Sequence, residues 1–262
     1  MGSWILQRPA RSQLKLWGKL GRAKVRQRED ICLVEGFKVV HELLKSRWQV
    51  GAILVMDEKR DRWEDYLDEL RKGIAVYSIT EKEWRKLSRD EEPEGLMAVA
   101  AIPWTVDLQK ILANSTGHIL MLHDIHDPGN LGALARTAHW FGIGTILLGA
   151  GSVDYTNAKA IRASMGSIFH LTVVDEIDLA AIIPTIKSHF FMVGSDVRTG
   201  ISPHPCRQRT ALLMGGESHG LPEGIAAAAH ERWHIEGRGG AESLSLPQAA
   251  AIMIYECTRR PP

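Results

Sequence analysis

The chain has 262 residues, enough for one large domain or two small ones with a substantial hydrophobic core. Its 32 Lys and Arg residues almost balance its 31 Asp and Glu residues, so attraction to a polyanion must come from the distribution of charge rather than from its sum. No apolar run approaches the roughly 18 residues of a membrane span, and the first residues lack the apolar stretch of a signal peptide. We therefore expect a soluble, cytoplasmic protein with no membrane partner.

Cysteine and histidine spacing gives no sign of a metal or disulfide framework. Three cysteines lie far apart in the sequence, at Cys32, Cys206 and Cys257. The absence of C-x-x-C spacing argues against a zinc knuckle, a redox pair and a disulfide framework, and it fits a reducing compartment. No cluster has metal-ligand spacing, and we expect His123, His126 and His139 to be packed or solvated rather than bound to a metal.

The first 28 residues are basic. They contain no Asp or Glu and eight basic residues, which are Arg8, Arg11, Lys15, Lys19, Arg22, Lys24, Arg26 and Arg28. Such a segment can be a solvated cationic tail or a contact surface for nucleic acid, and the sequence pattern alone leaves both interpretations open.

Hydrophobic periodicity predicts a small α/β unit over residues 1–101. A helical period begins at Phe37, just after Glu35-Gly36, and a buried strand follows over residues 50–55. The charged run 57–72 carries apolar residues every three or four positions, which predicts an amphipathic surface helix. The remaining predicted elements are a strand over 75–79, a helix from Glu81 to about Leu87 with a capping box at Thr80, and a strand over 95–102.

Residues 102–115 are expected to form a connector, partly helical, and residues 116–262 a second domain. Continuous apolar strands are predicted there over 118–123, 145–148, 190–193 and 210–214. Because helix-like stretches separate these strands, the pattern predicts a mostly parallel sheet covered on both faces. The fold class expected for the whole chain is therefore α/β.

The first of three chemically informative segments is HDPGNLGALARTAHWFGI, from His126 to Ile143. We predict a helix from about Asn130 to Phe141, with Asn130 as its N-cap and free backbone amides that favour an anion or a carbonyl oxygen. A merely structural cap is the alternative. Arg136 falls inside this apolar helical stretch, where a guanidinium usually reaches a partner, often a phosphate. The glycine spacing fits neither a dinucleotide fingerprint nor a Walker loop.

The second segment is LLMGGESHGLPEG, from Leu212 to Gly224. A predicted strand ends on Gly215-Gly216, and Glu217 follows. Glycines at the carboxyl end of a strand let the backbone approach a ligand closely, at the edge where open α/β sheets bind ligands. A tight turn with a solvated Glu217 is the alternative.

The third segment is IEGRGGAESLSLPQAAAIMIYE, from Ile235 to Glu256. A short strand over 233–236 leads to a glycine-rich loop, and a helix is predicted from about Leu246 to Cys257. Ser245 and Gln248 form an S-x-x-Q capping box, which explains Ser245 structurally. Ser243 precedes the cap and has no such explanation.

In order and spacing, the three segments resemble the motifs of the SpoU branch of the SPOUT superfamily, the RNA ribose 2'-O-methyltransferases. The matching stretches are Asn130 to Arg136, Gly215 to Leu221 and Glu242 to Ala251, and Arg162 to Gly166 is similar to a further family stretch. Residues 33–44 and 92–100 resemble the family's substrate-binding domain of ribosomal-protein type, so the likeness covers nearly the whole chain.

The resemblance implies an N-terminal RNA-binding domain and a C-terminal parallel α/β domain with a trefoil knot, a rare exception to ordinary topology. It also implies a homodimer and S-adenosylmethionine as cofactor. The residues expected to hold the cofactor are Met214, Gly215, Gly216, Glu217, Ile235, Ser243 and Leu244. The residues expected to hold RNA backbone are Arg22, Lys24, Arg26, Arg28 and Lys38, with ribosomal RNA favoured over transfer RNA by analogy alone.

In the resembled family, the arginine of the first motif is the proposed base, which here is Arg136. A guanidinium is protonated at physiological pH, so we expect Arg136 to orient the ribose hydroxyl and stabilise developing oxyanion charge. Asn130 and Ser243 would fix Arg136 and the ribose, and Glu217 would be an orienter or an alternative proton acceptor.

Ser245 departs from the family pattern, which has Asn at this position. Serine can cap the helix but cannot offer the two donors of an asparagine amide. Ser245 is a candidate member of the catalytic set, and its identity keeps open a non-catalytic RNA-binding or assembly factor on the same scaffold. A nucleotide-using hydrolase has less support, because no G-x-S-x-G elbow is present.

Overall fold

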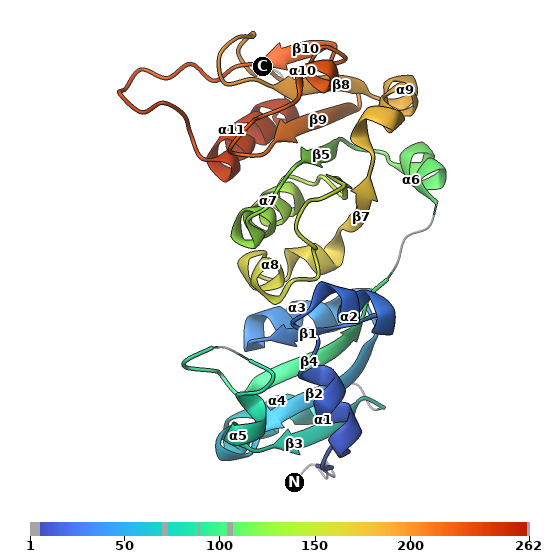
Figure 1. Ribbon diagram of the computed structural model, residues 1–262, viewed down its shortest axis with the longest axis vertical. Coiled ribbons are helices and arrows are strands. Elements are labelled where there is room, and N and C mark those ends of the chain that lie inside the picture. The colour runs from blue at the N-terminus through green and yellow to red at the C-terminus, as the bar shows by residue number, and fades with distance from the viewer. Residues whose placement is uncertain (1–5, 70–72, 89, 104–106, 261–262) are drawn as a thin grey trace. The chain divides into compact units, whose positions relative to one another are not determined.

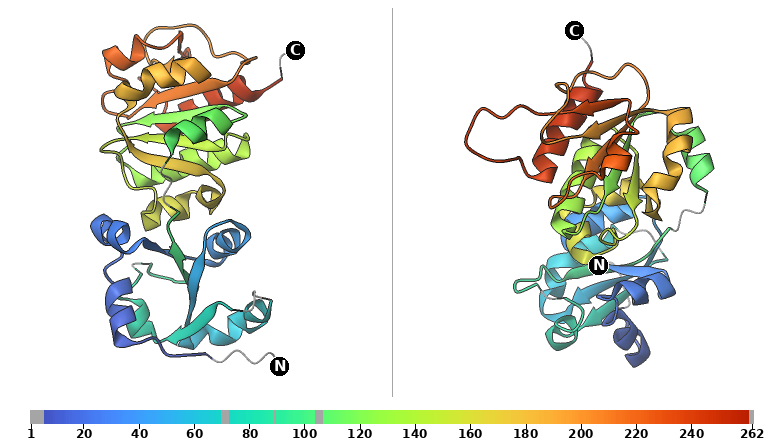
Figure 2. Two further views of the ribbon diagram at one scale, coloured as in Figure 1. Left: turned by 90° about the vertical axis from the view of Figure 1, so that its right-hand side faces the viewer. Right: turned by 45° about the horizontal axis from the view of Figure 1, so that its top comes forward.

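In the computed structural model, residues 6–69, 73–88, 90–103 and 107–260 are described. The chain divides into two compact units (Figures 1 and 2). Unit 1 comprises the described residues of 1–104 together with Thr156–Phe169, and unit 2 comprises the described residues of 105–155 and 170–262. No helix among the described residues is both long and apolar enough to cross a membrane.

Unit 1 is built on a four-stranded sheet with the order β1-β4-β2-β3. Its strands are β1 (Ile31–Glu35), β2 (Val50–Met56), β3 (Ala75–Ile79) and β4 (Leu96–Ala101). Strand β4 is antiparallel to β1 and β2, whereas β2 and β3 are parallel. The predicted strands over 50–55, 75–79 and 95–102 are thus confirmed, but the sequence analysis missed β1.

Short helices surround this sheet. They are α1 (Arg11–Trp17), α2 (Ala23–Glu29), α3 (Phe37–Lys45), α4 (Glu64–Asp68), α5 (Glu81–Trp84) and α8 (Ala158–Ala163), with 3-10 helices over Asp57–Trp63 and Ser167–His170. The core on the α1 and α5 side contains Trp17, Leu20, Leu54, Ile79 and Trp84.

The prediction of one long helix over 57–72 is wrong for the described residues. A 3-10 helix over Asp57–Trp63 comes first, and α4 follows it. The indole of Trp63 is buried and donates a hydrogen bond to Glu94 O at 3.2 Å, while Lys59 Nζ donates to Pro93 O. These contacts tie the segment to the loop before β4, and tertiary contacts of this kind override intrinsic helix propensity.

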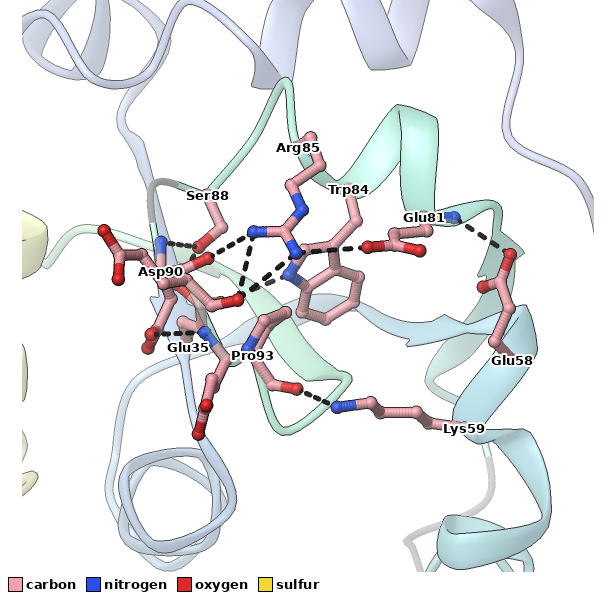
Figure 3. A network of polar contacts seen from close by, with 11 residues as sticks. Glu35, Glu58, Lys59, Glu81, Trp84, Arg85, Ser88, Asp90 and Pro93 are labelled. Atoms are coloured by element: carbon pink, nitrogen blue, oxygen red, sulfur yellow. Dashed lines mark hydrogen bonds and ion pairs between the residues drawn. The ribbon is translucent and has the colours of Figure 1, made fainter.

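A polar network joins α5 to β1 within unit 1 (Figure 3). The Glu35 carboxylate accepts hydrogen bonds from Trp84 Nε1 at 3.2 Å and from Ser88 Oγ at 2.6 Å. Arg162, which lies in α8, adds an ion pair to Glu35 at 2.9 Å. Because the Glu35 side chain is only 11% exposed, these partners supply the hydrogen bonds that it would otherwise lose on burial. The capping box of Thr80 and Glu83 at the start of α5 is confirmed.

Unit 2 contains a six-stranded sheet with the order β10-β8-β9-β5-β6-β7, in which every pair of neighbours is parallel. The strands are β5 (Ile119–His123), β6 (Thr145–Gly149), β7 (Thr172–Ile177), β8 (Phe191–Ser195), β9 (Thr210–Gly215) and β10 (Glu231–Trp233). The predicted parallel sheet is confirmed. The short strand predicted over 233–236 ends earlier, at Trp233, and the sequence analysis did not identify β7.

Helices cover both faces of this sheet. They are α6 (Leu108–Asn114), α7 (Pro128–Trp140), α9 (Leu179–His189), α10 (Glu223–Ala226) and α11 (Leu246–Thr258). One hydrophobic cluster joins α6, α9 and α10 to Ile119, Met121, Met192 and Leu213 of the sheet. The alternate strand residues Leu120, Leu122, Leu212 and Met214 are also buried, since neighbouring strand side chains point to opposite faces and α7 and α11 cover the second face.

Candidate active site

The strand order of unit 2 selects one place on the sheet edge. From β5 the chain proceeds through α7 to β6 on one side, whereas β9, the other neighbour of β5, leads to β10 on the opposite side. This reversal of direction is a topological switch point, and open α/β sheets bind ligands outside the carboxyl ends of the strands at such a point. The first two motifs lie there, directly after β5 and β9.

The helix of the first motif begins two residues earlier than predicted. Helix α7 starts at Pro128, and its N-cap is Asp127, whose Oδ1 accepts the Asn130 backbone N–H at 2.9 Å. The prediction that Asn130 is the N-cap is therefore wrong. Pro128 fits the first helical position because its missing N–H has no partner to lose there. The Asn130 side chain is consequently available for a contact outside the helix.

That contact is with the second motif. Asn130 Nδ2 donates a hydrogen bond to Glu217 Oε1, which joins segments 87 residues apart in the sequence. Glu217 is exposed and directly follows the glycine pair at the end of β9. The two motifs thus form one surface at the switch point, with an amide and a carboxylate holding each other.

Glycines 215 and 216 are required by close backbone approach. A Cβ on Gly215 would lie 2.1 Å from the Gly220 carbonyl carbon, and one on Gly216 would lie 2.2 Å from Asp124 O. The turn closes by a hydrogen bond from Gly220 N to Gly216 O at 2.9 Å. Asp124 has a φ of 59°, a left-handed conformation that Asp tolerates better than most residues. The loops after β5 and β9 therefore touch through their main chains.

The loop after β5 is also tied to the loop after β6. Ser152 Oγ accepts the Ile125 N–H at 3.1 Å, and Val153 N donates to Ile125 O at 2.7 Å. Within the loop after β5, His126 Nε2 lies 2.8 Å from Asp124 Oδ1. The sequence did not predict these contacts between the two loops. The start of α7 could have been found, because Asp followed by Pro is a recognisable signal for the beginning of a helix.

Arg136 lies on the exposed side of α7, while Leu131, Leu134, Ala135 and Ala138 are buried. The predicted tight packing of this helix is confirmed. In the part of the chain that the structure describes, Arg136 makes no ion pair or side-chain hydrogen bond, so the partner expected for it, such as a phosphate, would be a bound group. Its five donors are free for a group from outside.

The third motif is presented on an exposed loop. Residues 236–245 are exposed throughout, and Figures 1 and 2 show the connection from β10 to α11 extending outward from the rest of unit 2. Leu244 is 45% exposed and Ile235 is half-buried. Ser243 has no hydrogen bond to Arg136, Asn130 or Glu217 among the described residues, so these side chains are not brought together in this structure.

Ser245 begins α11 as predicted. Its backbone N–H and its Oγ both lie within hydrogen-bond distance of Gln248 Oε1, at 3.3 and 3.0 Å. The capping box therefore accounts for Ser245 locally. Helix α11 packs against α7 and β9, which carry the other two motifs.

One candidate RNA contact, Arg26, is buried. Its side chain is 3% exposed and donates to Leu20 O at 2.7 Å and to Thr156 Oγ1 at 2.9 Å. The expectation that Arg26 contacts RNA is therefore wrong, because its guanidinium is buried and donates hydrogen bonds to groups in the interior of unit 1. The other basic candidates, Arg22, Lys24, Arg28 and Lys38, are exposed.

No group of three or more His, Cys, Asp or Glu side chains that could hold a metal ion occurs among the described residues. The site does contain one unsatisfied polar atom. His123 Nδ1, at the end of β5 and paired in register with Gly215, is buried without a hydrogen-bond partner. Buried polar groups normally have partners, so a bound polar group at this edge would supply one.

Comparison with known proteins places these features in a family. The model of the SpoU rRNA Methylase family matches residues 117–255, and that of the MRM3-like substrate binding domain matches residues 11–98. The chain is 32% identical over 247 residues to the 23S rRNA (guanosine(2553)-2'-O)-methyltransferase RlmP of Bacillus subtilis, covering 93% of this chain and 94% of that protein. The chain belongs to the SpoU rRNA methylase family.

Solved structures support the same family fold. An RNA 2'-O ribose methyltransferase is similar with a TM-score of 0.75 and 25% identity, covering 96% of each chain. The SpoU methyltransferase AviRb from Streptomyces viridochromogenes, solved in complex with the cofactor AdoMet, matches with a TM-score of 0.81 over 94% of this chain and 97% of its own. At 23% identity, this second likeness concerns the fold alone.

Proposed function

We propose that this SpoU methylase transfers a methyl group from S-adenosylmethionine to a ribose 2'-hydroxyl in RNA, and that the RNA is ribosomal. The single observation that carries the proposal is the junction of Asn130 and Glu217 at the switch point, beside Gly215 and Gly216. The similarity to RlmP, whose name states 23S rRNA 2'-O-methylation, supports the substrate class.

The residues present fit S-adenosylmethionine. Main-chain groups around Met214, Gly215 and Gly216 form a turn in which a Cβ on either glycine would clash with neighbouring backbone. His123 Nδ1 is a buried polar atom without a hydrogen-bond partner among the described residues. We assign cofactor binding to these main-chain groups together with Glu217, Ile235, Ser243 and Leu244. When bound, the cofactor supplies a methyl group on a sulfonium, which needs no metal ion to react.

The protein's task in such a reaction is to position the ribose oxygen and exclude water. Arg136 is exposed and has unused donors, so we assign it the ribose hydroxyl, which it would orient while stabilising the oxygen's developing negative charge. Asn130 and Glu217 hold the first and second motifs together and would fix the sugar. Ser243 lies on the exposed loop and would help to fix the ribose when that loop contacts the cofactor and the RNA.

Unit 1 would carry the RNA. Arg22, Lys24, Arg28 and Lys38 are exposed cations, and phosphate contacts by such groups give affinity that falls as salt concentration rises. Because double-stranded RNA offers few base edges to a protein, an extruded ribose in a loop or bulge is the expected target. We take residues 1–101 as the RNA-binding domain, 102–115 as the linker and 116–262 as the methyltransferase domain.

We further propose a homodimer with a knotted C-terminal domain, located in the cytoplasm. Trp140 of α7 is 83% exposed, and Ile252 and Tyr255 of α11 are 40% and 51% exposed. Large exposed apolar groups on two packed helices are characteristic of a protein interface. Sedimentation should give twice the chain mass for the parent protein and the monomer mass for Trp140→Glu.

Calorimetry with S-adenosylmethionine, ATP and NAD, followed by mapping of ribose methylation in RNA from cells with and without the gene, tests the main proposal. We expect saturable binding of S-adenosylmethionine but not of ATP or NAD. We also expect one ribose methylation of ribosomal RNA to be absent from the cells without the gene. Heat for the cofactor without any lost methylation would identify the non-catalytic assembly factor instead. No heat for the cofactor, with or without RNA, would overturn the proposal.

A further inference from the structure

Two cysteines that are 51 positions apart meet in unit 2. Cys206 precedes β9, and Cys257 is the penultimate residue of α11. The backbone N–H of Cys206 donates to Cys257 O at 3.0 Å. A main-chain hydrogen bond of this length brings the two Cα atoms into the range that a disulfide spans, about 4.4–6.8 Å. The spacing of the cysteines in the sequence argued against a redox pair and did not predict this proximity.

The two thiols differ in their surroundings. Cys206 is partly exposed, whereas Cys257 is 1% exposed. The hydrogen bond from the Cys257 thiol lowers the pKa of Cys206 to about 7, and the same pairing raises the pKa of Cys257. One thiol is thus accessible and readily ionised, and the other stays protonated behind it. Cysteines that respond to oxidants are typically accessible, of low pKa and next to a second thiol.

Histidines flank the pair. The imidazole of His118 lies 3.6 Å from Cys257 Sγ through Nδ1, and the same Nδ1 accepts the Thr210 backbone N–H at 3.2 Å. This Nδ1 therefore carries no proton in the folded protein. His204, whose backbone oxygen lies 3.8 Å from Cys206 Sγ, pairs through Nε2 with Glu231 at 2.9 Å.

We propose that Cys206 and Cys257 form a peroxide-reactive site that closes reversibly into a disulfide. The site lies where β5 and β9 begin, at the opposite end of these strands from Gly215 and Asn130. It is thus separate from the candidate active site, and it does not depend on the proposed function. The bond would join the end of α11 to the segment before β9 and enclose the second and third motifs in one covalent loop.

The chemistry balances with hydrogen peroxide as the oxidant. The Cys206 thiolate attacks one peroxide oxygen, the O–O bond breaks, and the leaving hydroxide takes up a proton to become water. Cys257 then attacks the Cys206 sulfur and gives up its thiol proton. The S–O bond breaks, and the second hydroxide takes that proton. Two thiols lose two electrons in total, and peroxide becomes two waters.

The full-length native protein, treated with increasing hydrogen peroxide and then alkylated, tests the proposal. Trypsin should release residues 199–207 linked to residues 239–259, because cleavage after Arg198, Arg207, Arg238 and Arg259 isolates the two cysteines. We expect a mass loss of two hydrogens, reversal by dithiothreitol, and a higher melting temperature for the oxidised protein. Alkylation of both cysteines after peroxide, as in the untreated protein, would overturn the proposal.

Three variants sharpen the result. In Cys257→Ser, Cys206 should stop at the sulfenic acid and react with dimedone, whereas in Cys206→Ser the buried Cys257 should stay reduced. Cys32→Ser is the matched control, because Cys32 is buried in unit 1 and should not affect the linked peptide. Linkage of Cys206 to Cys32, or sulfonic acid at Cys206 in the parent protein without any link to Cys257, would contradict the proposed pair. The parent protein's peptides decide the matter even if a variant does not fold.

Discussion

The side-chain amide of Asn130 donates a hydrogen bond to Glu217 Oε1 and so joins the first motif to the second. Because Asp127 caps α7, the Asn130 side chain is not needed as the N-cap of that helix. The pair therefore fixes the loops after β5 and β9 relative to each other, at the edge to which we assign the cofactor.

The first prediction concerns Glu217. Glu217→Ala should lower kcat/KM about 10- to 100-fold, as expected for a lost positioning contact. Glu217→Gln should stay close to the parent value, since the amide oxygen of glutamine can still accept from Asn130. Methylation of the RNA target by each variant measures both. An equal loss in the two variants would mean that the charge of Glu217 matters, as a proton acceptor requires.

The second prediction concerns Arg136. Arg136→Lys should lower kcat about 100-fold while leaving S-adenosylmethionine binding unchanged, because an ammonium lacks the planar, two-donor geometry of a guanidinium. Since Arg136 is exposed and unpaired within the described chain, the melting temperature should not change. Single-turnover kinetics and calorimetry check the two parts. Full turnover by the lysine variant would exclude a bidentate role.

The third prediction compares two glycines. Gly216→Ala places a Cβ 2.2 Å from Asp124 O, so the backbone must shift, with a cost of about 1–3 kcal/mol in the free energy of unfolding. Cofactor binding should weaken as well. Gly224→Ala is the control, because its Cβ meets nothing within 4 Å, and within α10 it should stabilise by up to about 1 kcal/mol. Equal free energies of unfolding for the two variants in urea would refute the close approach of Gly216 to Asp124 O.

The fourth prediction compares two cations of α2. Lys24 is exposed, so Lys24→Gln should reduce the dependence of log affinity for RNA on log salt by about one charge and leave stability unchanged. Arg26 is buried, so Arg26→Gln leaves Leu20 O and Thr156 Oγ1 without their donor and should cost about 1–3 kcal/mol of stability. Filter binding over a salt series, with thermal unfolding, separates the two. A salt effect confined to Arg26→Gln would reverse these assignments.

The fifth prediction concerns pH. Burial lowers the pKa of His118, so the folded state favours the neutral imidazole, which accepts the Thr210 N–H. Because the folded pKa lies below the unfolded pKa, protonation of His118 favours the unfolded state. The stability contributed by neutral His118 is therefore fully present above the unfolded pKa, about 6.5, and is lost as pH falls toward the lower folded pKa. Between about pH 7.5 and 5.5, the parent should therefore lose more stability than His118→Gln. Equal losses in urea unfolding would remove His118 from the pH response.

Much of the candidate site could be predicted because its signals are local. The capping box of Ser245 and Gln248 involves residues three positions apart, and the strand ending at Gly215 shows in a short apolar run. The helix start at Asp127 was equally local, but Asn130 competed as a cap, and the choice depends on backbone geometry that residue types do not fix. The long helix expected over 57–72 failed because Trp63 is held by a distant loop.

The sequence by itself determined most of the strands, though not β1 or β7, and it determined which segments carry the family's motifs, since these signals depend on neighbours a few residues apart. Only the tertiary structure decided that Asn130 meets Glu217, that Arg26 is buried and that Cys206 meets Cys257. The physical reason is the order of the parallel sheet in unit 2 and the packing of each unit. Together they bring residues from distant parts of the chain to the same strand edge or interior, and residue spacing along the chain does not encode that order.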